Sequence, residues 1–111
     1  MSVEVKTVGD AKIVVVLRRF DAYTASQVET ELTKLVAEGA KKIVCDFGQT
    51  EYLASAGLRV LITASKSLAR VGGKIVLCCV KPYVMEVFEI SGLNRIFKMY
   101  PTVDEAVAAL A

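Results

Sequence analysis

Residues 41–61 read KKIVCDFGQTEYLASAGLRVL and predict a strand, a loop and the start of a helix. The apolar run 43–47 has the length and the β-branched content of a buried strand. The polar loop after it leads through Ser55 into a long segment with helical apolar spacing. The first backbone N–H groups of a helix lack intrahelical partners, and the helix dipole is positive there. Ser55 is therefore expected to be either the N-cap of this helix or an acceptor of phosphate, because the position favours an anion.

The bulk composition predicts one folded domain spanning residues 1–111. The hydrophobic fraction is 54% and the charged fraction 23%, which argues against disorder. The net charge of +2 is too small to predict direct binding of nucleic acid. No apolar run approaches the roughly 20 residues of a membrane span, and no apolar leader opens the chain, so we expect no membrane association.

The chain contains no histidine, which excludes histidine-based nucleophile activation and histidine metal sites. We therefore expect no enzyme, no cofactor and no metal site. The three cysteines, Cys45, Cys78 and Cys79, lie in apolar runs and are expected to be reduced core residues of a cytoplasmic protein. Neighbours on a strand point to opposite faces, so Cys78 and Cys79 are predicted not to share a metal ion.

The remaining elements follow from apolar periodicity and turn residues. An antiparallel hairpin is predicted from strands 3–8 and 13–17, joined at Gly9-Asp10. A first helix is expected to begin at Thr24 as N-cap, with Gln27 in the capping-box position. The further predictions are a strand at 42–47, a helix at 55–71, a strand at 74–80, a helix from Pro82 to Ser91-Gly92, a strand at 96–100 and a last helix capped by Thr102 with Glu105.

This order predicts an α/β fold with a mostly parallel central sheet of about five strands, an N-terminal antiparallel hairpin and about four helices. The apolar faces of two helices are also predicted. In the helix from Ser55 the core stripe is Leu58, Leu61, Ala64, Leu68 and Val71; in the helix from Pro82 the apolar residues are Val84, Val87, Phe88 and Ile90.

The segment from Asp46 to Leu58, DFGQTEYLASAGL, resembles the signature of STAS domains, specifically of bacterial anti-sigma factor antagonists. The resemblance extends over nearly the whole chain. It includes Phe20-Asp21-Ala22 with Thr24-Ala25, the glycine pair before Lys74-Ile75, residues 93–100 and the ending Thr102-Val103-Asp104-Glu105-Ala106.

The resemblance implies a switch between protein partners. In this family an unphosphorylated antagonist binds an anti-sigma factor that is also a serine kinase, and so frees a sigma factor. The kinase then phosphorylates a serine at the start of the second helix, and a separate phosphatase resets the system. The best-known members carry that serine directly before the glycine, where this chain has Ala56. Ser55 is the only hydroxyl between Tyr52 and Thr63, so the resemblance assigns the phosphate to Ser55.

The same resemblance implies a partner surface around Ser55 on a protein expected to be a monomer. Asp21 and Asp46 are expected near one rim of the sheet, where a phosphate beside Asp21 would repel an acidic partner. The expected partner contacts are Asp21, Thr24, Asp46, Ala54, Ala56, Gly57, Arg59, Thr63 and Lys66. Val60 and Ile62 flank the core stripe and would be apolar anchors if they were exposed.

Each assignment has a simpler structural alternative. Ser55 would be a plain cap, Asp21 and Asp46 would cap loops, and Gly57 would allow close approach of helix and sheet. The exposed face with Arg59, Thr63, Lys66 and Arg70 would be only a solvated stripe.

Two rival functions are also open from the sequence. The chain could be a STAS scaffold or a small-ligand or nucleotide-binding module that is never phosphorylated. A receiver domain that accepts phosphate on Asp46, with Lys81-Pro82 after a later strand, is disfavoured. Receivers need an acidic pair after the first strand, and Leu17-Arg18-Arg19 stands there.

Overall fold

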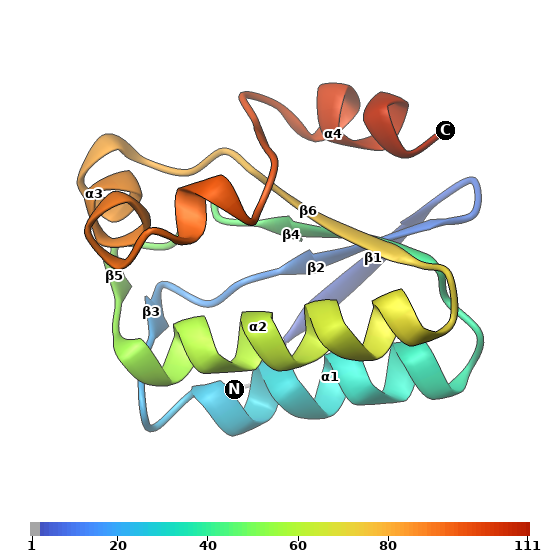
Figure 1. The fold of residues 1–111 in the computed structure, drawn as a ribbon, viewed down its shortest axis with the longest axis horizontal. Coiled ribbons are helices and arrows are strands. Elements are labelled where there is room, and N and C mark those ends of the chain that lie inside the picture. The colour runs from blue at the N-terminus through green and yellow to red at the C-terminus, as the bar shows by residue number, and fades with distance from the viewer. Residues whose placement is uncertain (1–2) are drawn as a thin grey trace.

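The computed structural model describes residues 3–111, and a five-stranded sheet forms its centre (Figure 1). The strand order is β1-β2-β4-β6-β7. β1 and β2 form an antiparallel hairpin, whereas the other neighbours pair in parallel. This arrangement confirms the predicted α/β fold. The strands are β1 (Glu4–Val8), β2 (Ala11–Val15), β4 (Lys42–Asp46), β6 (Lys74–Cys78) and β7 (Met99–Tyr100).

Helices cover both faces of the sheet. α1 (Ala25–Ala37) and α2 (Ser55–Arg70) lie side by side on one face, and α4 (Val103–Leu110) lies on the other (Figure 1). α3 (Pro82–Ser91) and the short 3₁₀ helix Leu93–Arg95 lie near one end of the sheet (Figure 1). No helix within residues 3–111 has the length and hydrophobicity needed to cross a membrane.

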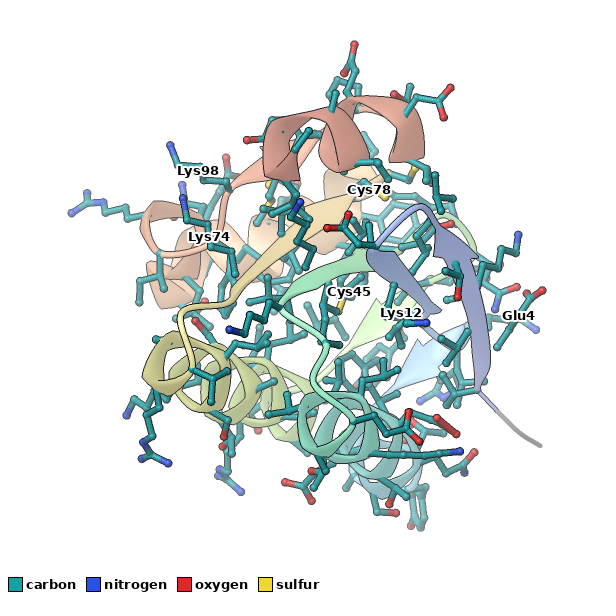
Figure 2. All side chains as sticks on the ribbon, turned by 90° about the vertical axis from the view of Figure 1, so that its right-hand side faces the viewer. Glu4, Lys12, Cys45, Lys74, Cys78 and Lys98 are labelled. Carbon is teal, nitrogen blue, oxygen red and sulfur yellow. The ribbon has the colours of Figure 1, made fainter. Side chains whose placement is uncertain are left out.

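The alternation of side chains along the strands divides the core into two layers. Ile43 and Cys45 of β4 pack in the larger layer, toward α1 and α2. Val44 and Cys78 pack in the smaller layer, with Ala106 and Leu110 of α4. Figure 2 shows this separation, with Cys78 toward α4 and Cys45 on the other side of the sheet.

Thr24 and Thr102 are the N-caps of their helices as predicted, but only Thr102 makes the expected side-chain hydrogen bond. Thr102 caps α4, and its hydroxyl accepts a hydrogen bond from the Glu105 amide at 3.1 Å. Thr24 is the N-cap of α1, but its side chain makes no cap hydrogen bond. The side-chain oxygen of Gln27 is buried without a partner among the described residues, so the predicted capping box does not form.

Two short strands outside the main sheet were not predicted. β3 (Arg19–Phe20) pairs in parallel with β5 (Tyr52–Leu53) and forms a separate two-stranded sheet. This pair joins the segment before α1 to the segment before α2 (Figure 1).

Three predictions about apolar residues were wrong. The strand expected at 96–100 shortens to β7, because the chain first forms the 3₁₀ helix and leaves Ile96 63% exposed. Val71 lies beyond the last residue of α2 and is exposed. Ile90 is 88% exposed, since it lies on the side of α3 away from Val84 and Phe88. The predicted stripe of Leu58, Leu61, Ala64 and Leu68 is buried as expected.

Candidate functional site

Ser55 is the first residue of α2 and is exposed to solvent. One of the two expectations, that Ser55 is the N-cap of this helix, is therefore wrong. Ala54 is the N-cap, with an extended backbone and no side-chain cap hydrogen bond. The Ala54 carbonyl accepts from the amides of Gly57 and Leu58. Within residues 3–111 the amides of Ser55 and Ala56 have no hydrogen-bond acceptor in the protein. Ser55 and Ala56 thus contribute two free N–H groups at the positive end of the helix.

The loop that carries Ser55 is hydrogen-bonded to the segment after β2. The buried Thr50 hydroxyl donates to the Leu17 carbonyl at 2.9 Å. The amides of Glu51 and Tyr52 both donate to the Arg18 carbonyl, at 2.7 and 3.2 Å. The Ala54 amide donates to the Phe20 carbonyl at 3.0 Å. These bonds fix the backbone up to the residue before Ser55.

Asp21 is buried, and its carboxylate organises the turn before α1. It accepts from the amides of Tyr23 at 3.0 Å and Thr24 at 3.3 Å, and from the Arg19 guanidinium at 3.2 Å. Burial acts to raise the pKa of Asp21, but these hydrogen bonds and the Arg19 charge outweigh it and hold the pKa below its ordinary value of 3.8. The carboxylate is therefore ionised at neutral pH and engaged within the chain.

The Thr24 hydroxyl belongs to the same turn. It donates to the Arg19 carbonyl at 2.7 Å and accepts from the Asp21 amide at 3.0 Å. Both predicted contact residues, Asp21 and Thr24, therefore stabilise the turn before α1, a structural role that the sequence had indicated for Asp21 as the alternative and for Thr24 as the N-cap.

Exposed tyrosine and arginine side chains flank the loop, and the sequence had not predicted them as part of the site. The Arg19 guanidinium carbon lies 4.4 Å from the centre of the Tyr52 ring. Tyr52 is three residues before Ser55, and Tyr23 is 89% exposed. Tyrosine and arginine are enriched where proteins bind one another. Arg19 and Tyr52 lie in two-residue strands and Tyr23 lies in a turn, and such short segments have no periodic pattern that could have identified these side chains.

Gly57 is buried where α2 crosses the β3–β5 pair. A Cβ atom at this position would lie 2.9 Å from the Phe20 ring and 3.0 Å from Leu53. The expected close approach is therefore confirmed, and the burial leaves Gly57 a packing residue and not a surface contact.

The residues of α2 that were expected to contact a partner lie at the surface. Arg59, Thr63 and Lys66 are exposed and follow Ser55 along one side of the helix. Ala54 and Ala56 are half-buried at its start. Val60 is buried and Ile62 is half-buried, so neither is the exposed apolar anchor that the sequence allowed.

The side chain of Asp46 is directed toward the α4 side of the sheet. Its side chain is near the thiols of Cys78 and Cys79, on the α4 side of the sheet, whereas Asp21 precedes α1 on the opposite side. The two carboxylates therefore lie toward opposite faces of the sheet. Both come at or after the carboxyl ends of the paired strands β2 and β4, so their position near one rim stays a prediction.

The expectation that Cys78 and Cys79 point apart is wrong. β6 ends at Cys78, and Cys79 has a φ of 60°, which interrupts the alternation of side chains. Their sulfur atoms and an Asp46 oxygen lie within 4.8 Å of one another.

Lys81 connects the start of α3 to the loop before Ser55. Its ammonium donates to the carbonyls of Gly48 at 2.8 Å and Thr50 at 3.4 Å. The sequence did not predict this contact, and Lys81 entered the analysis of the sequence only through the rival receiver hypothesis.

Replacing Lys81 by methionine is expected to lower the free energy of unfolding by about 1–2 kcal/mol, because two carbonyls lose a charged donor while the apolar stem is kept. Amide exchange in residues 48–51 should also accelerate. Urea denaturation and hydrogen-exchange NMR measure both effects. Lys98→Met is the matched control, since Lys98 is exposed and makes no side-chain hydrogen bond within the described chain. Equal effects of the two substitutions would contradict the role of Lys81.

Comparison with known proteins gives one family. The STAS domain matches residues 2–106. A Bordetella bronchiseptica protein named as an anti-sigma factor antagonist, BtrV, is 46% identical over 85 residues, which are 77% of this chain and 73% of that protein. A solved anti-sigma factor antagonist from Mycobacterium paratuberculosis superposes with a TM-score of 0.89 at 26% identity, over 98% of this chain and 92% of that one.

A more distant structure shares the fold. It is SpoIIAA from Bacillus in its phosphorylated form, with a TM-score of 0.77 at 20% identity, over 99% of this chain and 100% of that one. The loop motif, the observed sheet order and these matches agree, and the chain belongs to the STAS domain family, with proteins named as anti-sigma factor antagonists among its relatives.

Proposed function

We propose that this protein is a cytoplasmic anti-sigma factor antagonist that is switched by phosphorylation of Ser55. In its unphosphorylated form it binds an anti-sigma factor that is also a serine kinase, and a sigma factor is released. Phosphate transfer from ATP to Ser55 ends the binding, and a serine phosphatase restores it. The chain itself catalyses nothing in this scheme.

The observation that carries the proposal is the position of the Ser55 hydroxyl. It is exposed on the first residue of α2, at the end of a loop that hydrogen bonds hold in place. A kinase therefore meets an accessible acceptor in a fixed geometry. The hydroxyl of Thr50, in the same loop, is buried and bonded to the Leu17 carbonyl, so it does not compete.

The fold is expected to tolerate the modification. A phosphoserine carries about −1.5 to −2 charges at neutral pH. The free amides of Ser55 and Ala56 and the helix dipole stabilise that charge. Neither Ala54 nor Ala56 adds a carboxylate that would repel it. The effect of the phosphate therefore falls on the partner surface.

That surface combines charge with aromatic side chains. Arg59 and Lys66 on α2 suit acidic groups of a partner, and Arg19 and Tyr52 lie on the loop side of Ser55. A dianion placed between them repels the acidic partner groups that these cations attract. The names of BtrV and of the mycobacterial protein support a partner of the anti-sigma factor class.

The test is phosphorylation of the purified protein by the anti-sigma factor kinases of its own organism, with ATP and Mg²⁺. Intact mass and peptide mapping should show one phosphate on Ser55, and none on Ser55→Ala. Ser26→Ala is the matched control, because Ser26 is an exposed serine in the first turn of α1. It should be modified like the parent protein.

Binding measurements complete the test. Titration calorimetry should show weaker kinase binding after phosphorylation, with Ser55→Ala remaining bound in the presence of ATP. Binding without phosphorylation would indicate a constitutive antagonist and would contradict the switch. Neither binding nor phosphate would favour the scaffold or small-ligand alternative.

A further inference from the structure

A cluster of two thiols and one carboxylate lies at the carboxyl ends of β4 and β6. Asp46 and Cys78 are paired in register on these neighbouring strands, and Cys79 follows directly. One ligand atom from each residue lies within 4.8 Å of the other two. The proposed Ser55 switch uses none of these three residues.

The backbone brings the third ligand into place. A regular strand would turn Cys79 to the opposite face from Cys78. Instead Cys79 has a φ of 60°, and it is the only residue other than glycine with a positive φ within residues 3–111. The side chain consequently joins the smaller core layer, next to Cys78.

We propose that Asp46, Cys78 and Cys79 form a binding site for Zn²⁺. Thiolate sulfur and carboxylate oxygen are established zinc ligands, with bond lengths near 2.3 Å and 2.0–2.2 Å in tetrahedral geometry. Tetrahedral coordination separates two sulfur ligands by about 3.8 Å. A sulfur and an oxygen ligand are about 3.6 Å apart in the same geometry, so a contraction of at most about 1.2 Å brings the three atoms onto one ion.

Three protein ligands leave the fourth position for water. Cys79 lines a surface hollow together with Gly48, Lys81 and Tyr100, so one side of the cluster is open to solvent. Asp46 and Cys79 are only half-buried, whereas Cys78 is fully buried beneath α4. The ion enters from this hollow and not through the core. Cys45 cannot contribute, because it packs on the other side of the sheet (Figure 2).

Zinc binding here is coupled to proton release. Desolvation by burial raises the pKa of both thiols above the ordinary value of 9.0, so both are protonated in the metal-free protein. Each thiol gives up one proton to buffer as its sulfur bonds to Zn²⁺. The affinity is therefore expected to increase as the pH rises from 6 toward about 8.

The experiment is titration of the full, reduced protein with Co²⁺, followed by displacement with Zn²⁺. Sulfur-ligated tetrahedral Co²⁺ should produce intense visible absorption that Zn²⁺ abolishes. Cys79→Ser should weaken Co²⁺ and Zn²⁺ binding by roughly 10–100-fold or more, since losing even an outer-shell partner costs that much. Cys45→Ser is the matched control and should bind like the parent protein.

Asp46→Asn provides a second variant in case Cys79→Ser does not fold, and far-ultraviolet circular dichroism checks both. It should also weaken binding, because the neutral amide replaces a charged ligand. Absence of visible absorption on Co²⁺ addition to the folded parent would overturn the proposal. Equal affinities in Cys45→Ser, Cys79→Ser and Asp46→Asn would do the same. Neither result depends on phosphorylation of Ser55.

Discussion

Replacement of Phe47 by alanine should lower the free energy of unfolding by about 3–5 kcal/mol. Phe47 is fully buried directly after β4. Its ring centre lies 6.3 Å from that of Phe20 in a tilted arrangement and 5.9 Å from that of Phe88 in an edge-to-face arrangement. The substitution removes both aromatic contacts and leaves a cavity that the surrounding strands cannot close.

Urea denaturation at neutral pH measures the loss. Tyr23→Ala is the control for removing an aromatic ring, since Tyr23 is 89% exposed and should change the stability by no more than about 0.5 kcal/mol. A loss of less than about 1 kcal/mol for Phe47→Ala would contradict the assigned packing.

Gly57→Ala should lower the stability by about 1–3 kcal/mol, against the usual trend for helices. In an exposed helix the same change stabilises by about 1 kcal/mol, because alanine restricts the unfolded backbone. Here the new Cβ would lie 2.9 Å from the Phe20 ring and 3.0 Å from Leu53. One of these side chains, or the start of α2, must move.

A double-mutant cycle with Phe20→Leu separates this clash from other causes. Phe20→Leu is destabilising by itself, but it removes the aromatic ring that the new methyl group meets. The additional cost of Gly57→Ala should therefore be smaller in the Phe20→Leu background than in the parent protein. Additive effects, or a gain in stability from Gly57→Ala alone, would show that α2 does not approach Phe20 closely.

The regular elements of this fold could be predicted because their apolar patterns are long. The four helices have apolar residues at helical spacing, and β2, β4 and β6 contain continuous apolar, β-branched runs; the order of these elements implied the parallel sheet. Two-residue strands such as β3 and β5 have no periodicity, and they form only because two distant loops meet. The strand expected at 96–100 forms only at Met99–Tyr100, because the 3₁₀ helix at Leu93–Arg95 precedes it and apolar content alone did not mark where the strand begins.

The candidate site could be located from the motif, but its interactions could not. The motif predicted Ser55 at the start of α2, and the structure places it there. The burial of Asp21 and the reach of Lys81 to the loop depend on contacts between residues distant in the sequence. Likewise, the neighbouring position of Cys78 and Cys79 depends on one unusual φ angle that no pattern of residue types indicates.

The hydrogen bonds between the loop before Ser55 and the segment after β2 have a consequence for the entropy of association. Thr50, Glu51, Tyr52 and Ala54 all donate to carbonyls of that segment, so the loop has little conformational freedom to lose. A protein that docks on this loop therefore meets a backbone that is already held in place, and the loop adds little to the entropic cost of ordering on binding. Less of the interaction energy gained at this loop is then lost to ordering, so even a small contact area around Ser55 can contribute substantially to affinity.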